Sequence, residues 1–207
     1  AASPEKNVYL EFYAGTGKAT ARARSKHGML GIAIDYQADP AWDLHAPGVL
    51  PYLQDKIRHP LVKGGHLGTE CRRWSSAWHG TVGSGCPMPL RNYSNFIWGR
   101  PDLNQKDQMI VEKGNTDARF SMDIIASFLA SGKPITLTHV LGTMIWHIPR
   151  LEEDLLPCET QHRVDYSLMV RKWRTLHRLA VWKIPEEGYG DVAEDLYKKY
   201  PCQSEKH

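Results

Sequence analysis

The sequence lacks the features that would place it in a membrane or on a secretory route. Its longest apolar run is far shorter than the roughly 18 residues that suggest a membrane-spanning helix. No basic segment followed by an apolar stretch opens the chain, as it would in a secretory leader. We therefore expect an intracellular protein, with cytoplasm, nucleus and organelle all left open.

Cysteine is scarce, and its spacing is unlike that of a zinc or disulfide framework. No two cysteines form a Cys-x-x-Cys pair. We expect reduced thiols in an intracellular chain, and disulfide pairing is the alternative. Cys158 and His162 are four residues apart, but zinc would need a second such pair, so no metal site is predicted. The four cysteines are Cys71, Cys86, Cys158 and Cys202.

Charge and hydrophobicity are ordinary, which favours one folded domain over disorder. The charged fraction is 24%, the hydrophobic fraction is 42%, and 207 residues are enough to bury a continuous core. Segments of strand length alternate with helical segments, which predicts an α/β domain with a largely parallel sheet. We predict a single domain over 1–207, with its core at about 8–183 and a helical extension at about 186–207.

The predicted elements follow from hydrophobic periodicity and from the glycines and prolines that end each segment. Strands are predicted over 8–13, 31–35, 63–68 and 134–140, and helices over 18–27, 52–58, 117–131 and 191–200. Residues 80–115 are rich in Gly, Pro and Asn and are predicted to form a long loop. Residues 164–182 fit a helix and strands equally well.

A glycine turn joins the first predicted strand to the first predicted helix. Gly15 and Gly17 allow the backbone to approach a ligand closely, and the following helix N-terminus offers unpaired N–H groups. Asp35 ends the next strand, where such folds place a carboxylate for ribose hydroxyls. A nucleotide-cofactor site is therefore predicted at Phe12, Tyr13, Ala14, Gly15, Thr16, Gly17 and Asp35.

The turn lacks the third glycine of Gly-x-Gly-x-x-Gly, because position 20 is Thr20. This counts against a dinucleotide cofactor. The turn also differs from a P-loop, which has a longer loop before its Gly-Lys-Ser/Thr. A tight turn that binds nothing is the remaining alternative.

Phe12 to Gly17 resembles motif I of S-adenosylmethionine-dependent methyltransferases, notably the cytosine-5 group. Over about residues 8–183, the chain is more similar still to methyltransferase-like domains of retroelement and protist polyproteins. The resemblance implies a Rossmann-like class I methyltransferase fold with helices on both faces of the sheet. It also implies S-adenosyl-L-methionine as cofactor, with Asp43 near the adenine. The later matching segments are Asp35, Asp43-Leu44, Leu67 to Ser75, Gly114-Asn115, Thr143 to Trp146 and Trp173-Arg174.

The catalytic motifs depart from the family pattern. The resemblance places Cys71 at the Pro-Cys nucleophile of the cytosine-5 enzymes, but Glu70 stands where the proline is expected. The Glu-Asn-Pro triplet, whose glutamate handles the proton on cytosine N3, falls on Thr138-His139-Val140. Either His139, Glu70 or His66 supplies the acid–base group, or cytosine-5 chemistry has been lost. Cys71 is a nucleophile or a buried inert thiol, and His139 is catalytic or structural.

Basic clusters interleaved with tryptophans predict nucleic acid as the partner. Cations bind phosphates and bases stack on aromatic rings, whereas the alternative is a solvated basic face beside core tryptophans. The family's target-recognition domain has no room in this chain, so base selection is unexplained or supplied by a protein partner. The predicted substrate-binding residues are Arg72, Arg73, Trp74, Arg171, Trp173 and Arg174.

We therefore expect a methyltransferase that acts on RNA or DNA. The alternative is a catalytically degenerate domain that serves as a nucleic-acid-binding or structural subunit. An oxidoreductase with a nicotinamide cofactor is a third possibility, disfavoured by Thr20 and by the later motifs.

Overall fold

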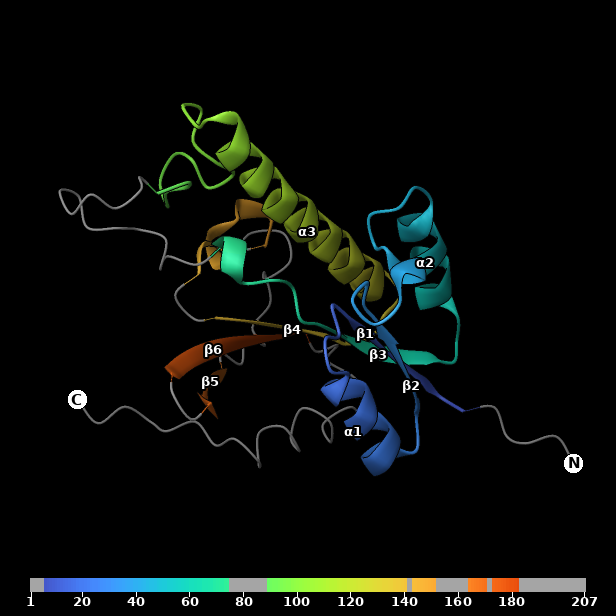
Figure 1. Cartoon of the computed structure of the whole chain (residues 1–207). Coiled ribbons are helices and arrows are strands. Elements are labelled where there is room, and N and C mark those ends of the chain that lie inside the picture. Colours follow the sequence, from blue (N-terminus) through green and yellow to red (C-terminus); the bar gives the residue numbers. More distant parts are fainter. Residues whose placement is uncertain (1–5, 75–88, 141–142, 152–163, 171–172, 183–207) are drawn as a thin grey trace, which may run out of the picture.

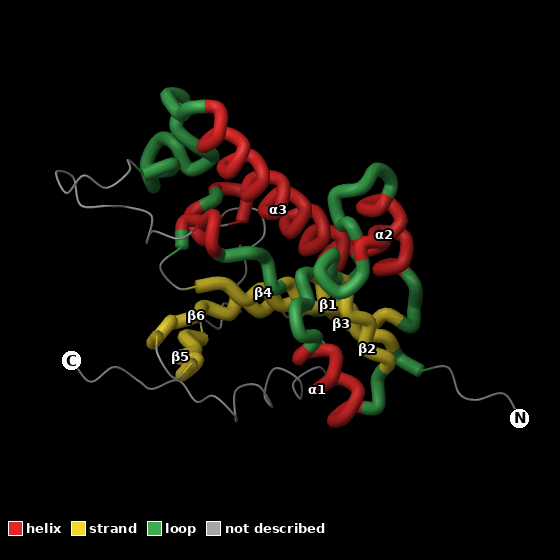
Figure 2. The backbone as a smooth tube through the Cα atoms, in the orientation of Figure 1, coloured by secondary structure: helices red, strands yellow, loops and turns green. Residues whose placement is uncertain are grey.

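The computed structural model describes residues 6–74, 89–140, 143–151, 164–170 and 173–182. A six-stranded sheet with the order β2-β1-β3-β4-β6-β5 forms its centre (Figure 1, Figure 2). The α/β class and the largely parallel sheet predicted from the sequence are confirmed.

Four of the six strands pair in parallel with one another, and a fifth runs antiparallel to both of its neighbours. The parallel strands are β1 (Val8–Phe12), β2 (Leu30–Ile34), β3 (Val62–Leu67) and β4 (Ile135–Val140). The reversed strand, β6 (Trp173–Trp182), pairs antiparallel with β4 on one side and with β5 (Val164–Val170) on the other. The segment at 164–182, which fits a helix and strands equally by sequence, is thus a pair of strands.

Helices cover both faces of the sheet. Figure 1 shows α1 (Lys18–His27) on one side, and α2 (Val49–Arg58) and α3 (Gln105–Ala130) on the other. The side chains of β1 explain the division, because neighbouring residues of a strand face opposite ways. Glu11 accepts hydrogen bonds from the start of α1, whereas Phe12 packs against Phe120 and Phe128 of α3.

The core lies mainly between the sheet and α3. The ring of Phe12 meets those of Phe120 and Phe128 edge-on, with centroids 6.4 Å apart in both pairs. Burial of each such ring contributes about 2–3 kcal/mol of hydrophobic free energy. The other large side chains that are wholly or almost wholly buried include Trp74, Ile34, Ile57, Leu67, Ile124, Ile125, Ile135, Leu137, Met144 and Ile145.

The start of α3 was placed wrongly from the sequence. The helix begins at Gln105, twelve residues before the predicted start at Asp117. Asn104 caps it, because its side-chain oxygen accepts a hydrogen bond from the N–H of Asp107 at 3.0 Å. Gly114 and Asn115 have low helix propensity and hid this part of the helix in the sequence. The predicted helix at 191–200 and the extension at 186–207 lie outside the described residues.

The strand order places a crevice at one defined position. From β1 the chain passes to β2 on one side, and β3 then returns to the other side of β1. Open α/β sheets bind their ligands at the carboxyl ends of the strands where the order reverses in this way. The crevice between the ends of β1 and β3 is therefore where a ligand site is expected.

The contact between α1 and β2 leads to the first prediction. A Cβ atom on Gly31 would lie 2.6 Å from the carbonyl oxygen of Thr20, inside van der Waals contact. We expect Gly31→Ala to lower the free energy of unfolding by about 2–3 kcal/mol through overpacking, measured by urea denaturation. Ala33→Val adds methyl groups at an exposed position of the same strand and should change the value by less than about 0.5 kcal/mol. Equal stability of the two variants would contradict this packing.

Candidate functional site

The predicted cofactor loop forms a tight turn directly after β1. Gly15 and Gly17 have φ angles of 53° and 65°, in the left-handed region that glycine adopts without strain. Among the described residues, Tyr13 is the only non-glycine residue with positive φ, at 53°. The N–H of Gly17 closes the turn on the carbonyl of Ala14 at 2.8 Å, and α1 starts at the next residue. Phe12, Ala14 and Thr16 complete the turn, with Phe12 and Ala14 buried and Thr16 exposed.

Asp35 lies against this turn, although twenty residues separate it from Gly15. Its Oδ2 accepts a hydrogen bond from the N–H of Gly15 at 2.7 Å, and its Oδ1 accepts one from the N–H of Gln37 at 2.7 Å. Each carboxylate oxygen has a second lone pair that can accept another donor. Asp35 therefore fixes the turn and retains acceptor capacity towards a ligand.

Asp43 shapes the loop after β2. It follows a short 3₁₀ helix, η1 (Pro40–Trp42), and its Oδ1 accepts a hydrogen bond from the N–H of His45 at 3.0 Å. The side chain of His45 is thereby directed towards α3, where its Nε2 lies 2.8 Å from Asp117 Oδ1.

A buried carboxylate that sequence reasoning missed lies at the start of α1. Glu11 is buried in β1, and its two oxygens accept the N–H groups of Ala19 at 3.3 Å and Thr20 at 2.7 Å. The positive end of the α1 dipole is thus neutralised from within the protein. An acid inside an apolar strand, followed by a helix with no acidic residue in its first turn, was the available signal.

A cavity of about 280 Å³ opens at the carboxyl ends of β1, β3 and β4. It brings the glycine turn together with two predicted catalytic residues, Cys71 and His139. The cavity is also lined by Thr138, which stands where the resemblance places a glutamate. The lining residues are Glu11, Tyr13, Ala14, Thr16, Lys18, His66, Gly68, Thr69, Cys71, Thr138 and His139.

The surroundings of Cys71 keep its sulfur protonated. Burial raises the pKa of the Cys71 thiol, because the thiolate would lose hydration. Glu70, the preceding residue, lies at the surface and forms an ion pair with Arg73. These described contacts therefore do not prepare a thiolate for attack.

His139 is buried within the protein at the end of β4. Its Nδ1 lies 2.6 Å from Thr143 Oγ1, and its ring meets that of Trp146 edge-on with centroids 6.0 Å apart. Trp146 belongs to a 3₁₀ helix, η4 (Met144–His147). These contacts fix the position of the His139 ring.

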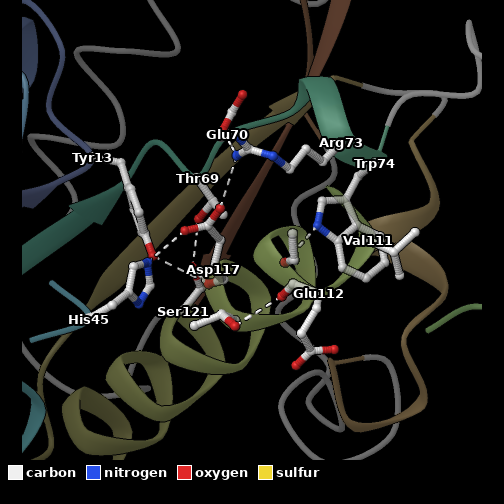
Figure 3. Close-up of polar contacts among 12 residues, drawn as sticks. Tyr13, His45, Thr69, Glu70, Arg73, Trp74, Val111, Glu112, Asp117 and Ser121 are labelled. Carbon is white, nitrogen blue, oxygen red and sulfur yellow. Dashed lines mark hydrogen bonds and ion pairs between the residues drawn. The ribbon is translucent and has the colours of Figure 1, made fainter. Parts of the chain in front are cut away.

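A polar cluster around Asp117 joins three loops to α3, as Figure 3 shows. The Asp117 carboxylate lies 2.8 Å from His45 Nε2 and 3.4 Å from an Arg73 guanidinium nitrogen. The backbone carbonyl of Asp117 accepts the Tyr13 hydroxyl at 3.4 Å and the Ser121 hydroxyl at 2.8 Å. Thr69 continues the cluster through a 2.7 Å contact between its hydroxyl and that of Ser121. Burial, and then the charge of Asp117, raise the pKa of Tyr13, so its phenol stays protonated.

A buried arginine explains why Gly114 and Asn115 lie inside a helix. Arg91 donates to Asn115 Oδ1 at 2.7 Å and to the carbonyls of Val111 and Ile97 at 2.8 Å each. Its guanidinium also lies 3.9 Å from the ring centre of Trp74. A Cβ atom on Gly114 would lie 3.0 Å from Arg91 and from Arg73, so the glycine permits this packing. Burial lowers the pKa of Arg91 to about 10, and the side chain remains charged at neutral pH.

The predicted substrate-binding residues within the described part of the chain lie in different environments. Arg72 and Arg73 lie in a 3₁₀ helix, η2 (Arg72–Trp74). Arg72 is exposed, and Arg73 forms ion pairs with Glu70 and Asp117. Trp74 is 0% exposed, so it offers no face for a base in this arrangement. Trp173 and Arg174 begin β6 beyond the residues that pair with β4, at the end of the sheet where the cavity lies. Arg171 lies outside the described residues.

Two other findings concern the described part of the chain alone. None of its helices combines the length and apolar character needed to cross a membrane. No three of its His, Cys, Asp and Glu side chains are grouped so as to hold a metal ion.

Comparison of the chain with protein-family models, curated proteins and solved structures finds no match.

The burial of His66 gives a prediction for acid conditions. Burial lowers its pKa from 6.5 to about 4, so the folded protein keeps the ring neutral while the unfolded chain takes up a proton below pH 6.5. The free energy of unfolding should therefore fall as the pH drops from about 6.5 towards 4. His66→Asn keeps a polar atom near Thr136 Oγ1, the present partner of Nδ1 at 2.7 Å, and should flatten this fall by about 2 kcal/mol.

Urea denaturation at several pH values measures the effect. His59→Asn changes an exposed histidine and serves as the control, with the wild-type dependence on pH expected. Parallel curves for wild type and His66→Asn would show that His66 is not the group responsible.

Proposed function

We propose that this chain is a Rossmann-like class I methyltransferase domain that binds S-adenosyl-L-methionine and acts on nucleic acid. The observation that carries the proposal is the glycine turn with Asp35 on one side and the buried Glu11 carboxylate on the other. Together they favour a nucleoside ligand that has hydroxyl groups for Asp35 and no phosphate for the helix N-terminus.

Glu11 is the discriminating residue between cofactor classes. Dinucleotides place their pyrophosphate at the N-terminus of the helix after the glycine turn. Here Glu11 already accepts the N–H groups of Ala19 and Thr20, and its charge would repel a phosphate. S-adenosylmethionine has no phosphate and carries cationic sulfonium and ammonium groups, which a carboxylate attracts. This supports S-adenosylmethionine over a nicotinamide dinucleotide.

The strand order supports the same choice. Classical dinucleotide-binding sheets are mostly parallel, with sequential strands extending outward from the switch point. In this protein the reversed strand β6 lies between β4 and β5, which departs from that order. The strand order therefore counts against a dinucleotide cofactor, as Thr20 does in the sequence.

The described active-site surroundings favour transfer to a heteroatom over transfer to cytosine carbon 5. Attack on carbon 6 of cytosine needs a thiolate, and burial keeps Cys71 protonated. A nitrogen or oxygen acceptor needs mainly a close, aligned approach to the methyl group, which a rigid cavity provides. The same observations also suit a domain that binds cofactor and nucleic acid without catalysis.

Cofactor binding is tested by titration calorimetry with S-adenosylhomocysteine and with NAD. We expect the chain to bind S-adenosylhomocysteine and not NAD. Asp35→Ala removes the acceptor of Gly15 and of the ribose hydroxyls, and should weaken the affinity at least tenfold, which corresponds to about 1.4 kcal/mol. Asp39→Ala removes a nearby loop carboxylate that caps η1, and should leave the affinity unchanged. Binding of NAD instead, or equal affinity in both variants, would refute the cofactor assignment.

Catalysis is tested separately, with S-adenosylmethionine that carries a radiolabelled methyl group and with pools of RNA and DNA. We expect labelling that survives in Cys71→Ser, because the acceptor is then a heteroatom. Labelling of cytosine that is lost in Cys71→Ser would instead establish the thiolate route. No labelling by a chain that binds S-adenosylhomocysteine would establish the non-catalytic alternative.

A further inference from the structure

Residues 89–100 form a closed loop at the Gln105 end of α3, here called the aromatic loop (bright green in Figure 1). Its two ends are joined where the N–H of Arg100 donates to the carbonyl of Leu90 at 3.0 Å. Within it, Asn92 Oδ1 accepts the N–H groups of Asn95 and Phe96, both at 2.9 Å. The loop therefore has a defined conformation of its own.

The aromatic loop is also fixed from beneath. Buried Arg91 reaches from the loop to Trp74 and to α3, and Asn115 donates from α3 to the carbonyl of Trp98 at 2.8 Å. Two strong polar side chains are thus committed to holding the loop backbone. Such anchoring reduces the conformational entropy that a binding partner would have to remove.

The anchored loop presents aromatic rings to solvent. Tyr93 is 50% exposed and Phe96 is 37% exposed. Met109, in the first turns of α3, is 70% exposed and adds apolar surface at the same end of the helix. Exposed aromatic side chains on a rigid, polar-anchored loop indicate a binding surface, because their exposure brings no gain in folding stability.

The loop is connected to the cavity through two segments that follow strands of the sheet. Arg91 Nε donates to the carbonyl of Arg73 at 3.3 Å, two residues after the cavity-lining Cys71. The Tyr93 ring meets the His147 ring of η4, the helix after β4, with centroids 4.9 Å apart. These contacts join the aromatic loop to the segments that follow β3 and β4, at the carboxyl ends of the strands where the cavity lies.

Two arginines beside the aromatic loop can contact phosphates, but carboxylates already neutralise part of their charge. Arg119 lies over the Trp98 ring at 5.2 Å and is half-exposed, so a cation from α3 is held against the aromatic loop. Arg100 and Arg119 are each paired with a carboxylate, Asp102 and Glu112 respectively. Phosphate contacts alone would therefore bind weakly here, and stacking on the exposed rings must contribute the larger share.

We propose that the aromatic loop is a stacking platform for single-stranded nucleic acid, which leads the substrate strand to the cavity. This inference rests on the proposed function for the role of the cavity, but binding to the platform does not require the cofactor. The rings of Tyr93 and Phe96 take successive bases, and Arg119 takes backbone phosphate. A single strand is favoured over a duplex because only an unpaired base exposes its face to a ring.

The test uses the full chain and a fluorescein-labelled oligonucleotide of about 12 nucleotides, within the usual site size of such surfaces. Fluorescence anisotropy measures its affinity as single-stranded DNA, single-stranded RNA and the matching duplex. We expect Tyr93→Ala and Phe96→Ala each to weaken single-strand binding at least fivefold, and Tyr93→Trp to retain it. The duplex should bind at least tenfold more weakly than the single strand.

Tyr52 provides a matched control on α2, which contacts α3 near its Ala130 end through Gln54 and Ser127. It is 52% exposed on α2, and Lys56 lies 5.1 Å from its ring centre, so it combines an exposed ring with a cation in another place. Tyr52→Ala should leave oligonucleotide affinity unchanged. Equal losses in the Tyr52 and Tyr93 variants, or no loss in either, would overturn the platform, as would equal binding of duplex and single strand.

Calorimetry with S-adenosylhomocysteine on the same variants separates the two proposals. We expect Tyr93→Ala and Phe96→Ala to bind it with the wild-type affinity, which also shows that they are folded. Cofactor binding without oligonucleotide binding would refute the platform and leave the proposed function standing. Oligonucleotide binding that depends on Tyr93, in a chain that does not bind S-adenosylhomocysteine, would refute the proposed cofactor and retain the platform.

Discussion

One buried carboxylate, that of Asp117, determines how the loops at the carboxyl edge of the sheet are arranged. A charge in the middle of a packed helix is unfavourable unless opposite charges and donors reach it. His45 comes to it from the loop after β2, and Arg73 comes from the segment after β3. Tyr13 reaches the carbonyl of the same residue from the glycine turn. The turn and both loops are therefore held in a common frame by α3.

Two further carboxylates, those of Glu11 and Asp35, are likewise paired with donors inside the protein. Glu11 neutralises the start of α1, and Asp35 binds the N–H of Gly15, so the fold stabilises its own turn before any ligand arrives. The positions of these two carboxylates restrict which chemical groups a ligand can place at the turn. They leave acceptor capacity for hydroxyl groups and disfavour additional negative charge at the helix start.

Much of the first half of the fold was predictable, because each element there carries its own local signal. The helix at 18–27 has the predicted bounds, and the flanking strands differ from prediction by one or two residues. Contacts with distant residues caused the failures. Gly114 and Asn115 read as loop residues, but they accommodate Trp74 and Arg91 within a helix. Trp74, predicted to bind substrate, is 0% exposed, and the Arg91 guanidinium lies 3.9 Å from its ring centre.

In the candidate site, too, local sequence signals were predictable and contacts between distant residues were not. Residues of the glycine turn and Asp35 could be grouped from sequence, because they occupy fixed positions in a strand–turn–helix–strand unit. Glu11 and Asp117 could not, since an acid among apolar residues does not reveal which distant N–H or cation it will meet. The protonation of Cys71 likewise depends on burial by residues far away in the chain.

The backbone of Tyr13 is strained, because its φ angle of 53° lies in the left-handed region. A left-handed conformation at a residue with a side chain costs about 1 kcal/mol, which glycine at that position would avoid. The ring of Tyr13 is held between His45 and Phe120, with centroids 6.5 Å and 6.0 Å away. The strained backbone of Tyr13 thus lowers the stability of the fold slightly and places its aromatic ring beside the glycine turn. Proteins often give up some stability in this way at sites that bind ligands.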